Sequence, residues 1–234
     1  MPIALEDGFY QTHDLAEVGC LGIETGRLNE CIARIRDHRI TGVFGSPSFG
    51  FTGSDLDFLA EMPWVEAVWF WDVNLKNIDG LYALQDLRHF GVHPKRPAID
   101  FSRFPKLRKA VIELKEKDRV LSCLNELELL HIWHYRPKDH SFASLALPKS
   151  LTELQINWAN PASLESLPAH TGLRRLEIHR CRNLEDLGDL GRKFPSLDHL
   201  VIDACVRVQP SEGERVIRDL PMLAHAYVQN VKLV

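Results

Sequence analysis

The stretch Leu151-Thr-Glu-Leu154-Gln-Ile156 decides the fold, because its spacing returns downstream as Leu173-Arg-Arg-Leu176-Glu-Ile178 and as Leu197-Asp-His-Leu200-Val-Ile202. The shared frame has apolar residues at positions 1, 4 and 6. Less regular frames begin upstream at Leu127, Leu107, Leu87 and Val65, and two degenerate frames begin at Ile40 and Leu223. Successive frames start 20 to 26 residues apart. A fixed period of this size is typical of a repeat architecture.

Over roughly residues 40–234 this pattern resembles the leucine-rich-repeat family. The best unit, LRRLEIHRCRNLEDL from Leu173 to Leu187, carries Cys181 where the family has Asn or Cys, and Cys205 takes the same place in the next unit. Other units hold different residues there, so the asparagine ladder typical of the family is missing. The resemblance implies an α/β solenoid, a right-handed superhelix with a parallel β-sheet on its concave face and short helical or irregular convex segments.

Each unit supplies one short strand whose apolar face it cannot bury alone. Stacked units form a parallel sheet with a continuous core, and the alternate side chains then point outward. We therefore predict an N-terminal cap over residues 1–39 and one continuous solenoid of about eight to nine units over residues 40–234. Leu154, Ile156, Leu176, Ile178, Leu200 and Ile202 are expected in the core.

The two ends of the repeat need cover. A helix from Leu28 to His38, with Leu28, Cys31, Ile32 and Ile35 on one face, is expected in the cap. Convex helices are expected over Asp55–Glu61, after Ser54, and from Ser211, where Ser-Glu-Gly-Glu has capping-box spacing, to a point before Pro221. At the other end, three solutions are open for the last strand. The segment Ser211–Leu220 folds over it, a neighbouring molecule covers it in a homo-oligomer, or it stays solvated.

The composition limits which cellular compartment and which classes of binding partner we expect. No apolar run approaches the ~20 residues of a membrane helix, and no secretory signal is visible. Five cysteines at irregular spacing indicate reduced thiols and a cytoplasmic protein. Residues 1–86 carry 5 Lys/Arg against 14 Asp/Glu and residues 87–234 carry 23 against 18, for a total of −4. This balance favours neither nucleic acid nor a membrane as partner.

The outward frame positions, 3, 5, 7 and 8, hold four of the five tryptophans and seven of the eleven histidines. Such aromatic residues on a sheet face are typical binding anchors. The candidate partner-binding residues are Trp69, Trp71, His131, Trp133, His134, Trp158, His179 and Arg180. Position 8 reads His134, Trp158 and Arg180 in successive turns, which predicts a guanidinium beside an indole face. Two alternatives remain: the frame is off by one in some units, or Trp69 and Trp71 pack under the cap.

Enzyme and metal interpretations have weaker support. His131 and His134 point to opposite faces unless the strand ends between them, and His89 and His93 are ~13 Å apart along a strand. His179 and Asp203 are expected as lateral neighbours ~4.8 Å apart, close enough to hydrogen-bond. The resemblance implies that Cys181 and Cys205 face inward, buried and reduced. The glycine-rich stretch Gly42–Gly50 lacks the lysine of a phosphate-binding loop. We predict no catalytic residue, no metal and no cofactor.

The resemblance implies protein–protein interaction. We expect a non-enzymatic module that recognises a protein or peptide on the concave face of its sheet. The irregular units look similar to stand-alone bacterial repeat proteins, some of which act as adaptor or immunity factors. Two alternatives stay open: a metal- or small-ligand-binding protein that uses the histidine-rich face, and a structural or oligomerising repeat protein.

Overall fold

In the computed structural model, which describes residues 3–13 and 18–234, the chain forms two compact units, residues 1–120 and 121–234. Of His93 and Pro94 only the backbone is described. Each unit is a mostly parallel sheet with few helices, and its strands follow one another in sequence order. The architecture is an α/β repeat-like fold.

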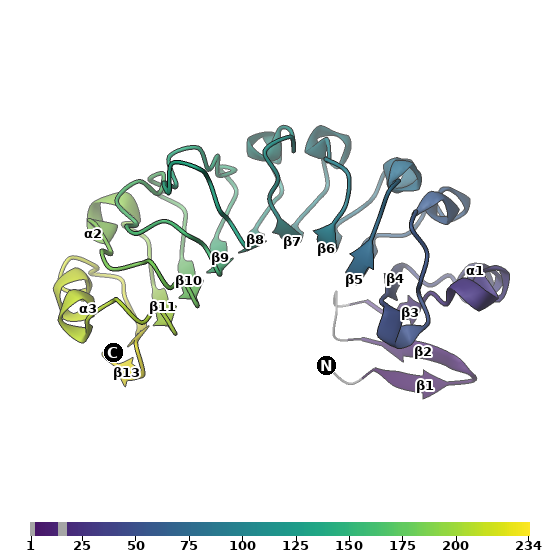
Figure 1. The fold of residues 1–234 in the computed structure, drawn as a ribbon, viewed down its shortest axis with the longest axis horizontal. Coiled ribbons are helices and arrows are strands. Elements are labelled where there is room, and N and C mark those ends of the chain that lie inside the picture. The colour runs from purple at the N-terminus through teal and green to yellow at the C-terminus, as the bar shows by residue number, and fades with distance from the viewer. Residues whose placement is uncertain (1–2, 14–17) are drawn as a thin grey trace. The chain divides into compact units, whose positions relative to one another are not determined.

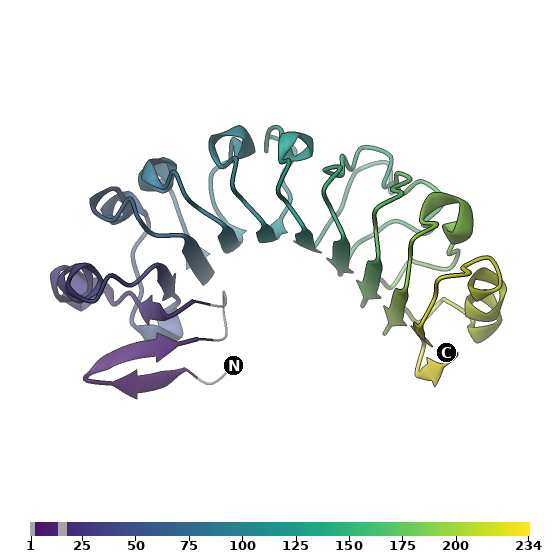
Figure 2. The same cartoon turned by 180° about the vertical axis from the view of Figure 1, so that it is seen from behind.

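Unit 1 (residues 1–120) begins with a hairpin and continues as a parallel sheet (Figures 1 and 2). Its strands are β1 (Ala4–Glu6), β2 (Phe9–Thr12), β3 (Cys20–Gly22), β4 (Gly42–Gly45), β5 (Ala67–Asn74), β6 (His89–Lys95) and β7 (Lys109–Glu113). The pairs β1–β2 and β2–β3 are antiparallel, and every pair from β3–β4 to β6–β7 is parallel. After α1 (Leu28–Asp37), the returns carry 3-10 turns at Pro47–Phe49, Asp57–Glu61, Asp79–Ala83 and Phe101–Arg103.

The repeat frame reaches further upstream than expected. Leu21 in β3 pairs in register with Val43 in β4, so Val18-Gly-Cys-Leu21-Gly-Ile23 occupies frame positions 1 to 6 of an additional turn. The expected helix is confirmed as α1, which buries Cys31, Ile32 and Ile35. It forms the return of this additional turn, inside the segment that we predicted as a cap.

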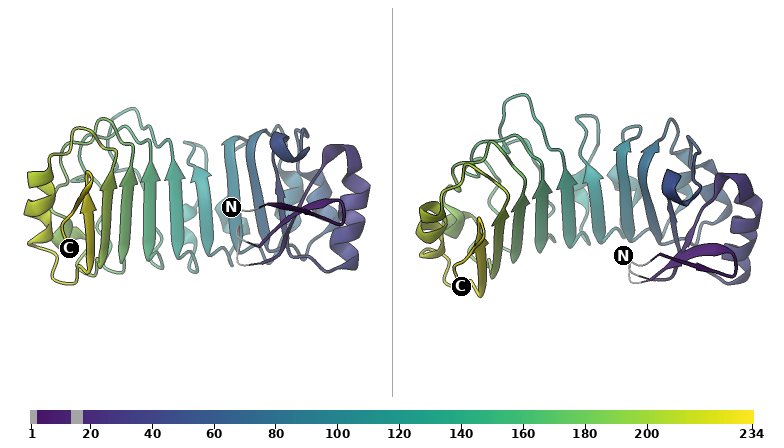
Figure 3. Two further views of the ribbon diagram at one scale, coloured as in Figure 1. Left: turned by 90° about the horizontal axis from the view of Figure 1, so that it is seen from below. Right: turned by 60° about the horizontal axis from the view of Figure 1, so that its bottom comes forward.

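Unit 2 (residues 121–234) contains the most regular part of the repeat. Its strands are β8 (Leu129–Trp133), β9 (Glu153–Asn157), β10 (Arg175–His179), β11 (His199–Asp203), β12 (His225–Val228) and β13 (Val231–Lys232). The strands β8 to β12 are parallel, as the aligned green arrows of Figure 3 show. A 3-10 turn (Leu121–Cys123) precedes β8. Helix α2 (Leu190–Lys193) lies between β10 and β11, and helix α3 (Pro210–Ile217) lies between β11 and β12.

The register of unit 2 follows the repeat frame. Leu154 pairs with Leu130 on one side and Leu176 on the other, and Leu176 pairs with Leu200. Position 6 lines up in the same way. The six predicted core residues, from Leu154 to Ile202, are each at most 1% exposed, so this prediction is confirmed. Burial of the same frame positions in every turn removes a continuous strip of apolar surface from water.

Two predicted helix starts were wrong. The segment after Ser54 forms only a 3-10 helix over Asp57–Glu61. Helix α3 begins at Pro210, so Ser211 lies inside its first turn and makes no capping bond. Proline fixes φ at a helical value and has no N–H to satisfy, which suits it to the first helical position. Helix α2 was not predicted; Asp189 caps it by accepting a hydrogen bond from the Arg192 amide.

The last parallel strand does not end the sheet. After Gln229 and Asn230, both with positive φ, β13 turns back and pairs antiparallel with β12. Helix α3 also packs against β12, with Gly213 beside Val228. Of the three alternatives for this strand, the structure thus has the convex segment packed on it, together with a short edge strand that none of them included.

The cysteines are free thiols, as predicted. Cys181 and Cys205 are both buried, and Sγ of Cys205 accepts a hydrogen bond from the Cys181 amide at 3.4 Å. Sγ of Cys181 accepts in turn from the Ala159 amide at 3.3 Å. Within the described residues, no helix is both long and apolar enough to cross a membrane.

Candidate functional site

The C-terminal ends of the strands in unit 2 share a backbone feature. The residue at frame position 8 has a left-handed conformation in four successive turns, with φ of 54° at His134, 53° at Trp158, 56° at Arg180 and 53° at Ala204. Bulky residues rarely adopt this conformation, which costs on the order of 1 kcal/mol or more each. The turn keeps position 8 on the outward side and buries position 9, where Tyr135, Ala159, Cys181 and Cys205 lie.

The outward position-8 side chains form a stack. The rings of His134 and Trp158 are 5.2 Å apart and nearly parallel, with an angle of 16° between their planes. The guanidinium carbon of Arg180 lies 5.0 Å from the centre of the Trp158 ring. The predicted contact between Arg180 and the indole face is therefore confirmed. The repeat produces it by placing three planar groups at one frame position in adjacent turns.

Trp133 and His131 extend this stack along β8. The ring centres of Trp133 and Trp158 are 4.8 Å apart, and those of His131 and Trp133 are 5.1 Å apart. Both tryptophans are half-buried on the outward side, so neither fills the core. We call the group His131, Trp133, His134, Trp158 and Arg180 the unit 2 aromatic cluster.

His131 is a neutral member of this cluster. Burial, and secondly the charge of His179, lower its pKa to about 4. Its Nε2 is hydrogen-bonded to the side-chain amide of Asn157, which is only 4% exposed although it faces outward. The ring thus contributes an uncharged hydrogen-bonding surface at neutral pH.

An ionic network lies next to the cluster, centred on Glu177. One carboxylate oxygen accepts a hydrogen bond from His179 Nε2 at 3.1 Å, and the other accepts from Arg175 at 3.0 Å. His199 Nε2 is 3.3 Å from the carboxylate. These donors, His179 first, lower the pKa of Glu177 to about 2, and the same bond raises the pKa of His179. The sequence did not single out Glu177, because a carboxylate at position 5 is also typical of a solvated surface.

His179 and Asp203 are lateral neighbours in register, as predicted, and they lie within ion-pair distance without a hydrogen bond. Its Nδ1 is 3.8 Å from the Asp203 carboxylate, which is longer than a hydrogen bond. Residues two apart on a strand share a face, so Glu177 reaches the other ring nitrogen from the same strand. His179 therefore belongs to the ionic network, and it lies close enough to His131 to affect its pKa.

The side chains of His131 in β8 and His134 directly after it do converge on one side. The strand ends at Trp133, and the left-handed turn at His134 places its ring 6.4 Å from the Trp133 ring, which His131 also contacts. The indole lies among them, and no group of three or more His, Cys, Asp or Glu side chains suited to a metal occurs in the described residues. The arrangement offers aromatic surface and fixed charges. We find no paired nucleophile and base in it.

Trp69 and Trp71 occupy a different environment in unit 1. Trp71 stacks on Phe44 at 5.9 Å and meets Phe49 edge-on at 5.8 Å, while Tyr10 of β2 meets Phe49 at 5.2 Å. Trp69 packs against the same group. This unit 1 aromatic cluster (Tyr10, Phe44, Phe49, Trp69, Trp71) includes Tyr10 of the N-terminal hairpin, in agreement with the alternative stated above that the two tryptophans pack under the cap.

Several expected outward positions of unit 1 are buried, among them those of Phe44, Ser46 and His89. Phe44 is fully buried although it stands at position 5, because the hairpin and Phe49 cover it. His89, at position 3, is 8% exposed. The frame correctly places Phe44 and His89 on the outward side, but other parts of the chain pack there.

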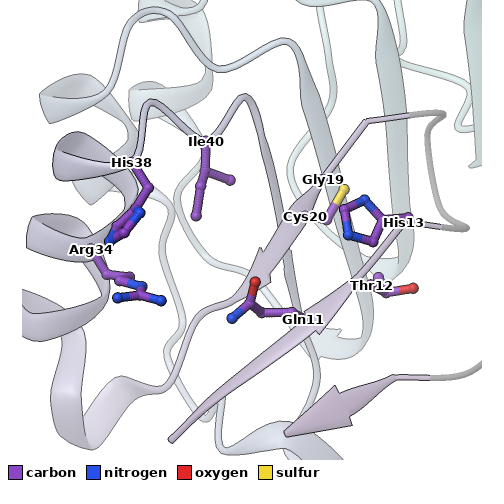
Figure 4. A pocket seen from close by; sticks show the side chains of 8 residues that line it. All are labelled: Gln11, Thr12, His13, Gly19, Cys20, Arg34, His38 and Ile40. Atoms are coloured by element: carbon purple, nitrogen blue, oxygen red, sulfur yellow. The ribbon is translucent and has the colours of Figure 1, made fainter. Parts of the chain in front are cut away.

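A small pocket of about 160 Å³ opens beside α1 in unit 1. Figure 4 shows Arg34 of α1 and His38, which follows α1, on one side of this pocket, and His13 and Cys20 on the other side. Arg34 already binds Asp7 at 2.8 Å, and burial raises the pKa of the Cys20 thiol to about 12, which leaves it a poor nucleophile. The chain continues from His13 into residues 14–17, which are not described, and we assign no role to the pocket.

The geometry of unit 2 is thus the main source of functional information, since comparison with known proteins adds none. No protein-family model matches this chain, and no curated protein matches it at a significant level.

Proposed function

We propose that this chain is a non-enzymatic leucine-rich-repeat module that recognises a protein or peptide through the outward side of β8 to β11. The single observation that supports this most is the unit 2 aromatic cluster. Trp133 and Trp158 are half-buried on a sheet face where neither fills the core. Tryptophan and arginine dominate binding hot spots, because they bury large surfaces and form directional contacts.

The cluster is already ordered before a partner arrives. Trp158 is held between His134 and Arg180, and Trp133 packs against its ring. Side chains that are fixed in advance lose little conformational entropy on binding. The left-handed turns at position 8, each carrying a strain cost, are also consistent with a surface shaped for recognition.

The repeat class itself is part of the proposal. Its support is the 20 to 26 residue period, the in-register parallel strands and the buried position 9, together with the convex returns that are short or helical. A right-handed superhelix and a cytoplasmic location with reduced thiols complete it. Adaptor or immunity activity is the narrower form of this function.

The rival functions have no feature of comparable weight. Metal binding by the histidines would need a cluster of ligands, and the residues described here contain none with three or more suitable groups. Self-association through the last strand would need an accessible edge of useful length, and the edge strand β13, which pairs with β12, has only two residues.

An affinity capture tests the proposal. Wild-type chain, a Trp133→Ala/Trp158→Ala variant and a control Met222→Ala, which removes a 63% exposed apolar residue elsewhere in unit 2, are used as baits in parallel. Captured proteins are identified by mass spectrometry, and the affinity of each is then measured with purified components. We expect one partner that wild type and Met222→Ala bind equally and the double variant loses. Equal binding by all three baits would refute the proposed surface.

A further inference from the structure

A row of arginines follows the strands of unit 2, beyond the positions that sequence analysis treated as outward. Because position 9 is buried, position 10 faces outward again, and Arg136, Arg182 and Val206 stand there in three turns. Arg180 precedes Arg182 at position 8, and Arg207 follows Val206. We call Arg136, Arg180, Arg182 and Arg207 the arginine rim; all four are exposed.

Four other arginines of unit 2 have carboxylate partners, whereas the described residues give none to the rim arginines or to exposed Arg218. The arginines at 174, 175, 192 and 215 pair with Asp198, Glu177, Asp189 and Glu212 respectively. Within the described part of the chain, no carboxylate lies within 4.0 Å of any rim guanidinium. Unit 2 thus pairs four of its nine arginines with carboxylates, and the four rim arginines follow the ends of β8, β10 and β11 without such a pair among the described residues.

Arg180 is held in a geometry that suits an anion. Its guanidinium lies over the Trp158 ring. The same ring stacks with His134, which follows the end of β8. Stacking uses the face of a guanidinium and leaves the N–H groups in its plane available for a bidentate contact with a carboxylate or phosphate. Because the side chain is already supported, such a contact requires less ordering than one with a free arginine.

The neighbouring surface favours a peptide over a nucleic acid. The indole of Trp158 has His134 and Arg180 stacked beside it, so little of its face remains for a base, whereas single-stranded nucleic acids bind by stacking on exposed aromatic faces. Unit 2 carries 13 Lys/Arg against 14 Asp/Glu, so it has no general positive field.

We infer that the arginine rim binds an acidic peptide segment of the partner, whose Asp or Glu carboxylates contact Arg180 and Arg182 while an apolar side chain meets the Trp133–Trp158 edge. This inference rests on the proposed function and specifies the chemistry of the partner. Arg180 and Arg182 are two residues apart and both exposed, which suits carboxylates carried on one extended chain, and the aromatic edge supplies apolar contact beside them.

A peptide selection tests this without knowledge of the partner. A random dodecapeptide phage library is selected on the full chain, and the enriched peptides are synthesised with a fluorescent label. Their affinities are measured by anisotropy for wild type, Arg180→Gln/Arg182→Gln, and the matched control Arg174→Gln/Arg192→Gln, which removes two carboxylate-paired arginines. Thermal unfolding of each variant checks that it is folded.

We expect enriched peptides rich in Asp and Glu with at least one apolar residue. Their affinity should fall at least tenfold in the rim variant and when salt is raised, and it should stay within about twofold in the control. Enrichment of neutral or basic peptides, absence of enrichment, or equal binding by the rim variant would overturn the inference. So would tighter binding of a 12-nucleotide oligothymidine, or rim-dependent self-association in light scattering.

The outcome can be separated from that of the proposed function by the tryptophan variant. If Trp133→Ala/Trp158→Ala loses the captured partner while Arg180→Gln/Arg182→Gln keeps it, the surface stands and its acidic ligand does not. If neither variant loses the partner, the proposed surface fails as well.

Discussion

Unit 1 and unit 2 both carry aromatic residues at outward frame positions, and the residues have different environments. In unit 1 the tryptophans at positions 5 and 7 of β5 pack with Phe44 and Phe49 below a hairpin that contributes Tyr10. In unit 2 the tryptophans at position 7 of β8 and position 8 after β9 pack mainly on each other, on histidines and on Arg180.

The comparison teaches that frame position fixes the direction of a side chain but does not fix its exposure. A short antiparallel extension at the start of unit 1 is enough to turn an outward aromatic surface into a second small core. All four tryptophans are half-buried. Those of unit 1 pack against a buried core cluster, and those of unit 2 are the ones that we propose for binding. The predictions below test this division.

The largest effect is expected for Phe44, the centre of the unit 1 aromatic cluster. Phe44→Ala removes a fully buried ring that contacts Phe49 and Trp71. It should lower the free energy of unfolding by about 3–5 kcal/mol. Leu176→Ala, in the main core of unit 2, is the reference and should cost about 2–5 kcal/mol. Urea unfolding measures both, and a loss below about 1 kcal/mol for Phe44→Ala would show that its position is solvated.

The second effect separates stability from binding. Trp133→Ala or Trp158→Ala should weaken partner binding by about 2 kcal/mol or more and change the unfolding free energy by less than about 1 kcal/mol. Trp71→Ala, in the unit 1 cluster, should do the reverse and cost about 1–3 kcal/mol of stability with unchanged affinity. Calorimetric titration with the captured partner and urea unfolding give the two quantities. A large stability loss with unchanged affinity for the unit 2 variants would contradict their assignment to a binding surface.

A third effect sharpens the account of Trp69. Its indole lies across Gly91 of β6, and a Cβ at that glycine would fall 2.2 Å from the ring. Gly91→Ala must therefore displace the indole, with an expected cost of about 1–3 kcal/mol. Gly26→Ala is the control, because a Cβ there meets no atom within 4 Å. Equal thermal stability of the two variants would mean that Trp69 does not pack as described.

Sequence reasoning recovered those features that depend on the repeat frame alone. Register, the buried positions 4 and 6, the paired Cys181 and Cys205, and the Trp158–Arg180 stack all follow from which residues share a frame position. The arginine rim was not predicted, because only positions up to 8 were expected to face outward. The left-handed turn at position 8 shows that position 10 can face outward again.

Features that depend on contacts outside the frame could not be predicted. The additional turn at Val18–Ile23 is different, because Val18, Leu21 and Ile23 fill positions 1, 4 and 6 and the sequence therefore did hold this signal, although a cap was predicted there. The hairpins at β1–β2 and β12–β13 are too short for a period-two signal to be distinct. The choice of Glu177 over Asp203 by His179 depends on side-chain geometry, which spacing does not determine.

The smallest effect concerns pH and His131 in the unit 2 cluster. Burial lowers its pKa to about 4 in the folded chain from 6.5, so between these values the unfolded chain binds a proton that the folded chain does not. Its contribution to stability is therefore present above pH 6.5 and is lost as the pH falls toward 4, with a slope of up to about 1.4 kcal/mol per pH unit. His131→Gln should remove this slope.

His179 and Glu177 lie in the neighbouring ionic network, and their own titrations also affect the pH dependence of stability. The raised pKa of His179 stabilises the fold below pH 6.5, which opposes His131, and the lowered pKa of Glu177 adds stability that is lost only as the pH falls from 4.5 toward 2. Burial also lowers the pKa of His199, which therefore acts with the same sign as His131. The difference between wild type and His131→Gln in urea unfolding between pH 4.5 and 7 isolates the His131 contribution, with exposed His140→Gln as the matched control. An identical pH profile for wild type and His131→Gln would mean that His131 is solvated and that the unit 2 cluster is looser than its ring distances indicate.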